Sequence, residues 1–384
     1  VRLNERRINM AFNDINLDAI DLFCGAGGLS RGLEDSGITV RLGIELNPIA
    51  ATTYKNNLQG NVIIDDIRNI SSESIMHMLN INVGELFLVA GCPPCQTFSS
   101  LQKNNTNKDE RNNLIMEYVR IVLELQPLFI QLENVPGLKR GRGKKIFKKA
   151  TDQLSALYEI NSDILNCADY GIPQKRKRLV LHGIRRDAFQ LLKKSIPDFT
   201  VALPQATHSE TPNNQHNNTL HPWVPARVAF NNLPAVIAGQ NAPLGFPNHE
   251  TNGLSPINIE RIQYIQTHGG SRNCLPERLQ LPCHQKNNVG YTGVYGVIDP
   301  NQPAPTMTGG CITYSKGRYG HPTQARAITV REAARLQSFT DDYIFSGTRG
   351  QAALQVGNAV PPLLAQASGT YFLNILKQLQ EIPV

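Results

Sequence analysis

The residues with the clearest chemical potential are the two thiols of Cys92-Pro-Pro-Cys95, which follow the apolar run Leu86–Ala90. A short apolar run bounded by Gly84 and Gly91 is typical of a buried strand. The two prolines fix the backbone and remove two amide donors, so the segment cannot continue as a helix. We therefore expect a strand whose end delivers two thiols onto a rigid turn.

This motif is compatible with several chemistries. A C-x-x-C spacing at a strand end suits a dithiol redox centre. The same spacing is half of a zinc site, but the sequence contains no second C-x-x-C or C-x-x-H pair, so we predict no metal. One thiolate could instead attack an electrophilic carbon, or the turn could be purely structural. The motif alone leaves the redox, nucleophilic and structural interpretations open.

A glycine-rich turn near the N-terminus indicates a ligand site. The strand-like run Ala19–Cys24 leads into Gly25-Ala-Gly-Gly28 and a helical pattern, which lets a ligand approach the backbone at a helix N-terminus. The next strand-like run ends in Glu45, about 20 residues later, where dinucleotide-binding folds place a carboxylate on ribose hydroxyls. The third glycine of the dinucleotide spacing is missing, which favours a nucleoside ligand without a pyrophosphate.

Two further strand-like runs end in acids. Asp65 and Asp66 close the run that begins at Asn61, and could reach an adenine amino group or merely cap a helix. The run Leu128–Glu133 ends in a carboxylate of its own. Because open α/β sheets bind ligands at the carboxyl ends of their strands, these positions predict one site at one edge of a sheet.

The charge balance favours a polyanionic partner. Lys and Arg number 38 against 31 Asp and Glu, a net charge of +7. Two basic runs occur at Lys139–Lys149 and Gln174–Arg178. A solvated face is the ordinary explanation of such runs. We expect both runs to flank the carboxylate-bearing edge of the sheet, which favours a track for a phosphate backbone.

The sequence offers no sign of a membrane protein. No apolar run is long enough to span a bilayer, and the N-terminal residues lack the apolar core of a signal peptide. The seven scattered cysteines suit a reducing compartment. We expect a cytoplasmic protein.

A change in composition divides the chain. From about Arg186 to Gln324 the sequence is rich in Pro, Asn, Gly, Gln and His and has no sustained helical or alternating pattern, which predicts a loop-dominated small domain with a few short strands. After it, Thr329–Glu332 is a capping box, and Pro361-Pro362 begins another helix. We expect a large α/β domain in residues 1–185, the small domain in 186–324, and helices in 325–384 that complete the first.

Taken together, the motifs of this chain resemble those of the C5-cytosine DNA methyltransferases. They occur in that family's order: Asp21–Gly28, Gly91–Gln96, Asp109–Leu114, Glu133–Val135, Gln174–Arg178, Arg331–Phe339 and Gln355–Pro362. One match would be weak, whereas the whole ordered set is hard to explain by chance. The resemblance implies an α/β, Rossmann-like, S-adenosylmethionine-dependent methyltransferase domain with a smaller, loop-rich target recognition domain.

The resemblance also assigns catalytic roles. It implies that Cys95 is the nucleophile and that Cys92 is non-catalytic. Glu133 would contact the N3 edge of the cytosine and Arg178 its O2. Arg176 would support the neighbouring loop or a phosphate.

The remaining implied roles are binding roles. S-adenosylmethionine would be the cofactor, held by Phe23, Gly25, Gly27, Glu45, Asp66, Ile67, Pro94 and Asn358. The DNA substrate would be contacted by Gln96, Ser99, Gln174 and Thr306, the last of which resembles a threonine that packs near the flipped nucleotide.

The chemistry of cytosine requires groups of these types. C5 is a poor nucleophile until a thiolate has added to C6. A carboxyl group at N3 and an arginine at O2 disperse the charge that then develops on the ring. Because C6 is shielded inside a duplex, the base must be flipped out of the helix.

Three other functions compete with this one. An RNA (tRNA) cytosine-5 methyltransferase could use the same catalytic set, but the long region Arg186–Gln324 favours DNA because a separate domain suits the reading of base edges. A dithiol oxidoreductase leaves Glu133, Arg178 and the glycine-rich turn without roles. An inactive reader of methylation would have a broken catalytic pattern, and the pattern here is intact.

We therefore expect a sequence-specific bacterial enzyme that acts as a monomer on double-stranded DNA. Its expected setting is restriction-modification, defence or orphan methylation, with a cognate restriction endonuclease or defence system as a functional partner. The sequence does not specify the target site.

The basic run Lys139–Lys149 generates a prediction about salt dependence. Each phosphate contact contributes about −0.9 to the slope of log K against log salt concentration. Replacing Lys144, Lys145, Lys148 and Lys149 together by Gln should therefore flatten the slope measured for binding to duplex DNA. An unchanged slope would return this run to the solvated-face interpretation.

Overall fold

The computed structural model describes residues 12, 15–94, 113–212, 220–285 and 293–382, and it divides into two compact units. Unit 1 contains Val1–Asn166, Lys177–Gln205 and Pro362–Val384, and unit 2 contains Cys167–Arg176 and Ala206–Pro361. The helices between residues 325 and 361, which the sequence analysis grouped with the large domain, thus lie in unit 2. The functional domain boundaries stay a prediction.

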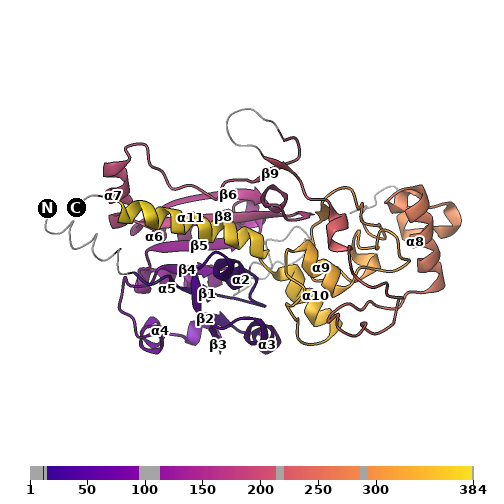
Figure 1. Ribbon diagram of the computed structural model, residues 1–384, viewed down its shortest axis with the longest axis horizontal. Coiled ribbons are helices and arrows are strands. Elements are labelled where there is room, and N and C mark those ends of the chain that lie inside the picture. Colours follow the sequence, from indigo (N-terminus) through magenta and orange to yellow (C-terminus); the bar gives the residue numbers. More distant parts are fainter. Residues whose placement is uncertain (1–11, 13–14, 95–112, 213–219, 286–292, 383–384) are drawn as a thin grey trace. The chain divides into compact units, whose positions relative to one another are not determined.

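Unit 1 is built on a seven-stranded sheet of order β3-β2-β1-β4-β5-β8-β6 (Figure 1). β8 runs antiparallel to β5 and to β6, and every other neighbouring pair is parallel. The α/β class expected from the sequence is therefore confirmed. The strands are β1 (Asp18–Leu22), β2 (Thr39–Glu45), β3 (Asn61–Ile64), β4 (Leu88–Gly91), β5 (Phe129–Asn134), β6 (Tyr158–Asn166) and β8 (Lys177–Arg185).

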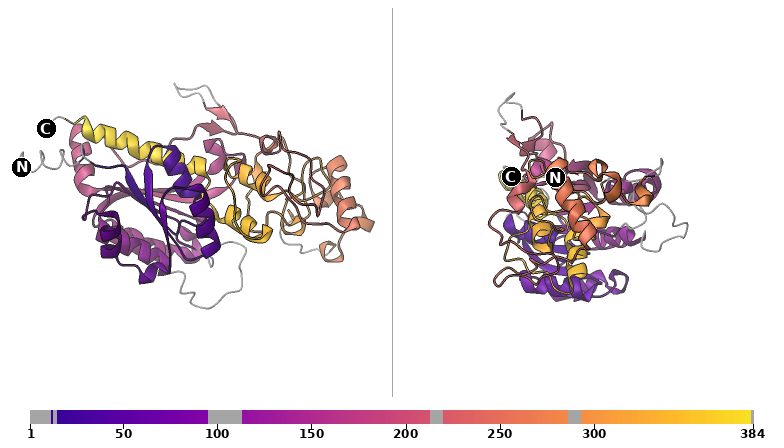
Figure 2. Two further views of the ribbon diagram at one scale, coloured as in Figure 1. Left: turned by 60° about the horizontal axis from the view of Figure 1, so that its bottom comes forward. Right: turned by 90° about the vertical axis from the view of Figure 1, so that its right-hand side faces the viewer.

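Helices cover both faces of this sheet. On one face, side chains of α4, α5 and α6 share a buried cluster with residues of the strands. On the other face α11 packs against α2 (Figure 2). Phe372 of α11 also contacts Phe129 of β5. The helices of unit 1 are α2 (Gly28–Asp35), α3 (Pro48–Asn57), α4 (Ser72–Leu79), α5 (Leu114–Leu125), α6 (Lys144–Leu154), α7 (Arg186–Ser195) and α11 (Pro362–Gln380).

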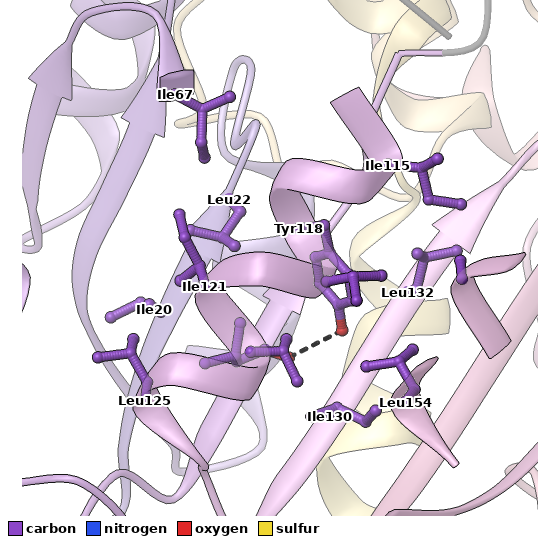
Figure 3. Packing of buried hydrophobic residues seen from close by; sticks show 14 of the residues in the cluster. Ile20, Leu22, Ile67, Ile115, Tyr118, Ile121, Leu125, Ile130, Leu132 and Leu154 are labelled. Carbon is purple, nitrogen blue, oxygen red and sulfur yellow. Dashed lines mark hydrogen bonds between the residues drawn. The ribbon is translucent and has the colours of Figure 1, made fainter. Parts of the chain in front are cut away.

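Helix α5 anchors the larger core. The sequence predicts a helix from residue 114 to about 125, stopped by Pro127, and the structure confirms it. Its Ile115 and Ile121 lie among Leu22 and Leu132 of the strands (Figure 3). The hydroxyl of Tyr118 on the same helix donates to the carbonyl of Gln131, 2.9 Å away. With a longer bond of 3.4 Å from the same hydroxyl to the carbonyl of Val89, it ties the helix to β5 and β4.

The C-terminal helix joins unit 1 through small residues. A Cβ at Gly32 of α2 would lie 2.1 Å from the carbonyl oxygen of Pro362, and one at Gly369 of α11 would lie 2.2 Å from the hydroxyl oxygen of Ser36. Only glycine lets the two helices approach this closely. Helix α11, which comes late in the sequence, therefore completes unit 1.

Unit 2 contains short strands and isolated helices. Its strands are two-residue pairs, β7 (Gln174–Lys175) with β11 (Ala304–Pro305) and β9 (His208–Ser209) with β10 (His221–Pro222). Its helices are α8 (Pro256–His268), α9 (Val330–Leu336) and α10 (Arg349–Asn358).

The sequence analysis found no sustained helical pattern between residues 186 and 324, yet the structure forms both α7 and α8 there. Helix α8 spans 13 residues there and begins with Pro256 at its first turn. Of its thirteen residues only Arg261, Ile262 and Ile265 are buried, so no wide apolar stripe marks it. The capping box that starts α9 is confirmed, since the Thr329 side chain accepts from the amide of Glu332 while the Glu332 side chain accepts from that of Thr329.

Because α2 and α11 approach each other closely, adding a single methyl group between them should destabilise the fold. Gly32→Ala should lower the free energy of unfolding by roughly 1–3 kcal/mol, because the new Cβ forces the two backbones apart. Gly350→Ala is the control, since this helical glycine has open space around its Cβ position. Urea denaturation of both variants would show the difference. Equal stability of the two would contradict the packing argument.

Candidate active site

Parallel strands bring the predicted ligand-binding residues of unit 1 to one edge of the sheet. The carboxyl ends of β1, β2, β3, β4 and β5 all face that edge. Because β8 runs the other way, its first residues lie there too, and Val180 pairs with Glu133. Residues separated by more than 150 positions in the sequence, from Phe23 to Arg178, thus share one edge.

The glycine-rich turn after β1 adopts the left-handed backbone that its sequence predicts. Phe23 has φ 64°, Gly25 φ 55° and Gly27 φ 88°. A Cβ at Gly25 would meet no atom within 4 Å, so glycine is needed there for its backbone angle rather than for lack of room. The turn leaves open space beside its backbone at the start of α2.

Glu45, at the end of β2, is fixed by two backbone amides. Its Oε2 accepts from Gly25 at 2.9 Å and its Oε1 from Asn47 at 2.7 Å. Burial raises the pKa of this carboxyl, and the two amide bonds act against that shift. Each oxygen can accept a further hydrogen bond, so the carboxylate is oriented and still able to bind hydroxyl groups.

Asp66 follows β3 and is paired with a neighbour that the sequence analysis did not consider. Arg68 Nη2 lies 2.6 Å from its Oδ2, and Arg68 Nε lies 3.0 Å from its Oδ1. These bonds lower the pKa of the Asp66 carboxyl. The same carboxyl caps a short helical turn that begins at Ile67, which is buried. Both interpretations of Asp66, ligand contact and helix cap, therefore remain compatible with its position.

Glu133 lies at the centre of a buried polar cluster. Its side chain is 2% exposed. Arg178 Nε lies 2.9 Å from Oε1 in an ion pair, and Cys92 Sγ donates to Oε2 at 2.9 Å. The geometry of the ion pair is not that of a hydrogen bond, so within the described residues Oε1 has no hydrogen-bond donor. One oxygen of the carboxylate is held by the thiol, and the other is buried beside Arg178 with its hydrogen-bonding capacity unused within the described residues.

The turn that leads to the predicted nucleophile is rigidly held up to Pro94. The amide of Cys92 donates to the carbonyl of Leu22 at 3.1 Å. The Asn134 side chain donates to the carbonyl of Pro93 at 2.8 Å. Pro94 is half-buried beside them. Cys95, Gln96 and Ser99 lie outside the described residues, and their roles stay predictions.

Arg176 is placed in unit 2 and is almost completely buried. Its guanidinium donates to the carbonyls of Met307, Gly357 and Ala359 at 2.8–3.0 Å. It therefore joins the segment that carries Thr306 to the segment that carries Asn358. Of the two roles that the resemblance offered, loop support and phosphate contact, this geometry favours loop support.

Gln174 has a similar internal role. Its Nε2 donates to the carbonyl of Leu336 and to Oε1 of Gln337, and its Oε1 accepts from the amide of Met307. The side chain is fully buried. A direct contact with a substrate would break these bonds, so we propose that Gln174 acts by holding the Met307 segment in place. Half-buried Thr306 donates to the carbonyl of Lys175, and Asn358 is exposed at the end of α10.

The sequence analysis missed a buried acid beneath the glycine-rich turn. Asp21, within β1, is fully buried, and its Oδ2 accepts from the hydroxyl of Ser30 on α2 at 2.7 Å. Within the described residues Oδ1 has no hydrogen-bond partner. Burial, with a smaller contribution from Glu45, raises the pKa of Asp21 to about 7. The sequence did contain a signal for this buried acid, because Asp21 stands between the apolar residues Ile20 and Leu22 of the strand.

The basic side chains of α6 are exposed, as a phosphate track requires. Lys144, Lys145, Lys148 and Lys149 point to solvent, while Phe147 and Leu154 of the same helix are buried. Lys148 Nζ pairs with Asp152 Oδ2 at 2.6 Å, which makes this lysine less available to a phosphate.

Among the described helices, none is long and apolar enough to cross a membrane. No metal-binding group of three or more ligands occurs in the described residues.

Comparisons with known proteins agree on one family. Its model, described as "C-5 cytosine-specific DNA methylase", matches residues 17–373. A Type II methylase of Herpetosiphon aurantiacus is 32% identical over 94% of this chain and 96% of its own length. A Type II methyltransferase of Haemophilus parahaemolyticus is 34% identical over 92% of this chain and 86% of its own length.

Solved structures agree on the fold. A candidate DNA modification methyltransferase encoded within an E. coli prophage has a TM-score of 0.67 and 26% identity, and the match covers 94% of this chain and 99% of that one. The Dnmt2 methyltransferase of S. pombe has a TM-score of 0.58 over 93% of this chain and 98% of its own, at 16% identity, and so shows the fold alone.

Asp21 gives a prediction about stability and pH. Because its folded-state pKa lies above the ordinary value of 3.8, its protonated form contributes stability that is complete below about pH 3.8 and is lost as the pH rises through about 7. Asp21→Asn removes this titration. Its free energy of unfolding should therefore rise relative to wild type by roughly 2–4 kcal/mol between pH 4 and pH 8. Parallel stability curves in urea titrations would contradict the burial argument.

Proposed function

This chain belongs to the C-5 cytosine-specific DNA methylase family, and from that premise we propose that it transfers a methyl group from S-adenosylmethionine to C5 of one specific cytosine in duplex DNA. The observation that best supports the proposal is the ion pair of the buried Glu133 with the half-buried Arg178 at the edge where the Cys92–Pro94 turn ends. A carboxylate oxygen without a hydrogen-bond donor within the described residues, and a guanidinium nitrogen 2.9 Å from it, are complementary to adjacent N3 and O2 atoms of a cytosine.

The donor set of unit 1 fits a nucleoside. The left-handed turn at Gly25 leaves space beside the backbone, and the oriented Glu45 carboxylate suits ribose hydroxyls. Asp66 and Ile67 would meet the adenine, with Phe23, Gly27 and Pro94 around them. Asn358 lies in unit 2, and its contact with the cofactor is part of the proposal. When bound, S-adenosylmethionine supplies an electrophilic methyl group on a sulfonium sulfur.

The protein's own groups would carry the covalent steps. The thiolate of Cys95 forms a bond to C6, and the electron pair of the C5–C6 double bond moves toward N3 and C5. Glu133 stabilises N3 through a proton or a strong hydrogen bond, and Arg178 stabilises the charge at O2. After C5 has taken the methyl group, loss of the C5 proton restores the double bond and expels the thiolate. The base reaches this site only when flipped from the duplex.

We propose that the target sequence is read by the residues between 186 and 324. Residues 206–324 of this stretch make up most of unit 2, whereas residues 186–205 lie in unit 1, and the stretch carries none of the proposed covalent chemistry. The relatives described as Type II methylases support a role in a restriction-modification or related defence system, with a cognate endonuclease as the functional partner.

A stalled reaction would test the proposal directly. A cytosine with fluorine at C5 can accept the methyl group but cannot lose fluorine as a cation, so the enzyme should stay attached through Cys95. Duplex DNA carrying 5-fluorocytosine at the target, with S-adenosylmethionine present, should give an adduct that survives denaturing electrophoresis.

Two variants and one alternative substrate complete this test. Cys95→Ser should form no adduct, whereas Cys92→Ser should still form one, because only one thiol bonds to the base. Attachment that required Cys92 would overturn the assignment of the nucleophile. Attachment to a structured RNA and not to DNA would favour an RNA methyltransferase instead.

A further inference from the structure

The contact between Cys92 and Glu133 has no role in the reaction as described so far. The thiol comes from the turn after β4 and the carboxylate from the end of the neighbouring strand β5. Sγ and Oε2 are 2.9 Å apart, and the thiol is the donor because an ionised carboxylate can only accept. The backbone amide of Cys92 is fixed to the carbonyl of Leu22, so the position of the thiol is set by the sheet itself.

The two oxygens of Glu133 have different environments. Oε2 accepts the thiol proton, whereas Oε1 faces the guanidinium of Arg178 and has no hydrogen-bond donor within the described residues. A side chain that is 2% exposed would normally have both oxygens hydrogen-bonded. Rotation of the carboxylate about its last bond would exchange the two oxygens. Among the described contacts, the hydrogen bond from the Cys92 thiol to Oε2 is the one that opposes this rotation.

We propose that Cys92 is a positioning residue, which orients Glu133 through a hydrogen bond to Oε2 so that Oε1 points toward N3 of the flipped cytosine. This inference rests on the function proposed above. It assigns a role to the first cysteine of the C-x-x-C motif that is neither redox nor nucleophilic. The thiol acts through the carboxylate and does not touch the reacting atoms.

The state of the thiol supports this role. Burial, and then the charge of Glu133, raises the pKa of Cys92 well above its ordinary value, so at neutral pH the side chain keeps its proton. A protonated thiol can donate a hydrogen bond but is a poor nucleophile and a poor redox centre. A thiol is also a weaker donor than a hydroxyl. It therefore orients the carboxylate while withdrawing little of the basicity that lets Oε1 share a proton with N3.

Paired substitutions at position 92 test the proposal. Cys92→Ala removes the donor, and Cys92→Ser restores one of similar size. The rate of adduct formation with 5-fluorocytosine DNA, measured in a single turnover with saturating enzyme and cofactor, should fall about 10-fold in the alanine variant, the effect of one hydrogen bond to a charged group. The serine variant should recover to within about 3-fold of wild type, as expected when a hydroxyl replaces a weak thiol donor.

A double-mutant cycle separates positioning from general damage. In a Glu133→Gln background, where the carboxylate is gone, adding Cys92→Ala should change the rate by less than about 2-fold. Covalent adducts accumulate over hours, so slow variants remain measurable. A full 10-fold loss in that background, or a serine variant as slow as the alanine variant, would overturn the proposal.

The same experiments distinguish this inference from the proposed function. If wild-type protein forms no adduct with any DNA duplex and methylates none, the proposed function fails. If wild type is active and Cys92→Ala is equally fast, only the positioning role fails. Affinity for DNA and for S-adenosylmethionine, measured by calorimetry, should stay within about 2-fold of wild type in Cys92→Ala, because the lost bond acts within the protein.

Discussion

The antiparallel pairing of β8 with β5 is the constraint on which the candidate site depends. If β8 ran parallel to β5, Arg178 would lie at the opposite edge of the sheet from Glu133. Because it is antiparallel, the first residues of β8 and the last residues of β5 share an edge, and the guanidinium reaches the carboxylate. The parallel order of the other strands brings Glu45 and Cys92 to that edge as well. The reversed direction of β8 thus brings the Arg178 guanidinium to the site.

Buried polar groups cost free energy unless they are bonded, and the two units meet this cost differently. In unit 1 two buried acids each leave one oxygen without a hydrogen-bond partner among the described residues, Glu133 at Oε1 and Asp21 at Oδ1. In unit 2 buried arginines satisfy carbonyls that loops leave without strand partners. Arg331 donates to the carbonyls of Thr340 and Tyr343, and Arg326 pairs with Glu332 inside the unit.

The loop-rich segments of unit 2 are therefore held by side chains rather than by a large sheet. This explains why two residues that the motifs predicted to be site residues are instead hydrogen-bonded within unit 2. Arg176 and Gln174 are types that bind phosphates and bases, yet both bond internally. Arg176 donates to the carbonyls of Met307 and Ala359, whereas Gln174 donates to the Gln337 side chain and accepts from the Met307 amide. Their residue types indicated hydrogen bonding correctly. Only the surrounding carbonyls show that the partners are internal.

The sequence by itself indicated the strands that lead to Glu45, Cys92 and Glu133, though not β6, because apolar runs, glycines and caps act locally. The helix ending at Leu125 and the capping box at Thr329 are confirmed. It also determined the family, through an ordered set of motifs. Tertiary structure alone decided the contacts between distant segments. The bond between Cys92 and Glu133 joins residues 41 positions apart, and the buried state of Asp21 depends on helices packed over β1. Such contacts leave no periodic signal, since pairing direction and burial are set by the whole sheet.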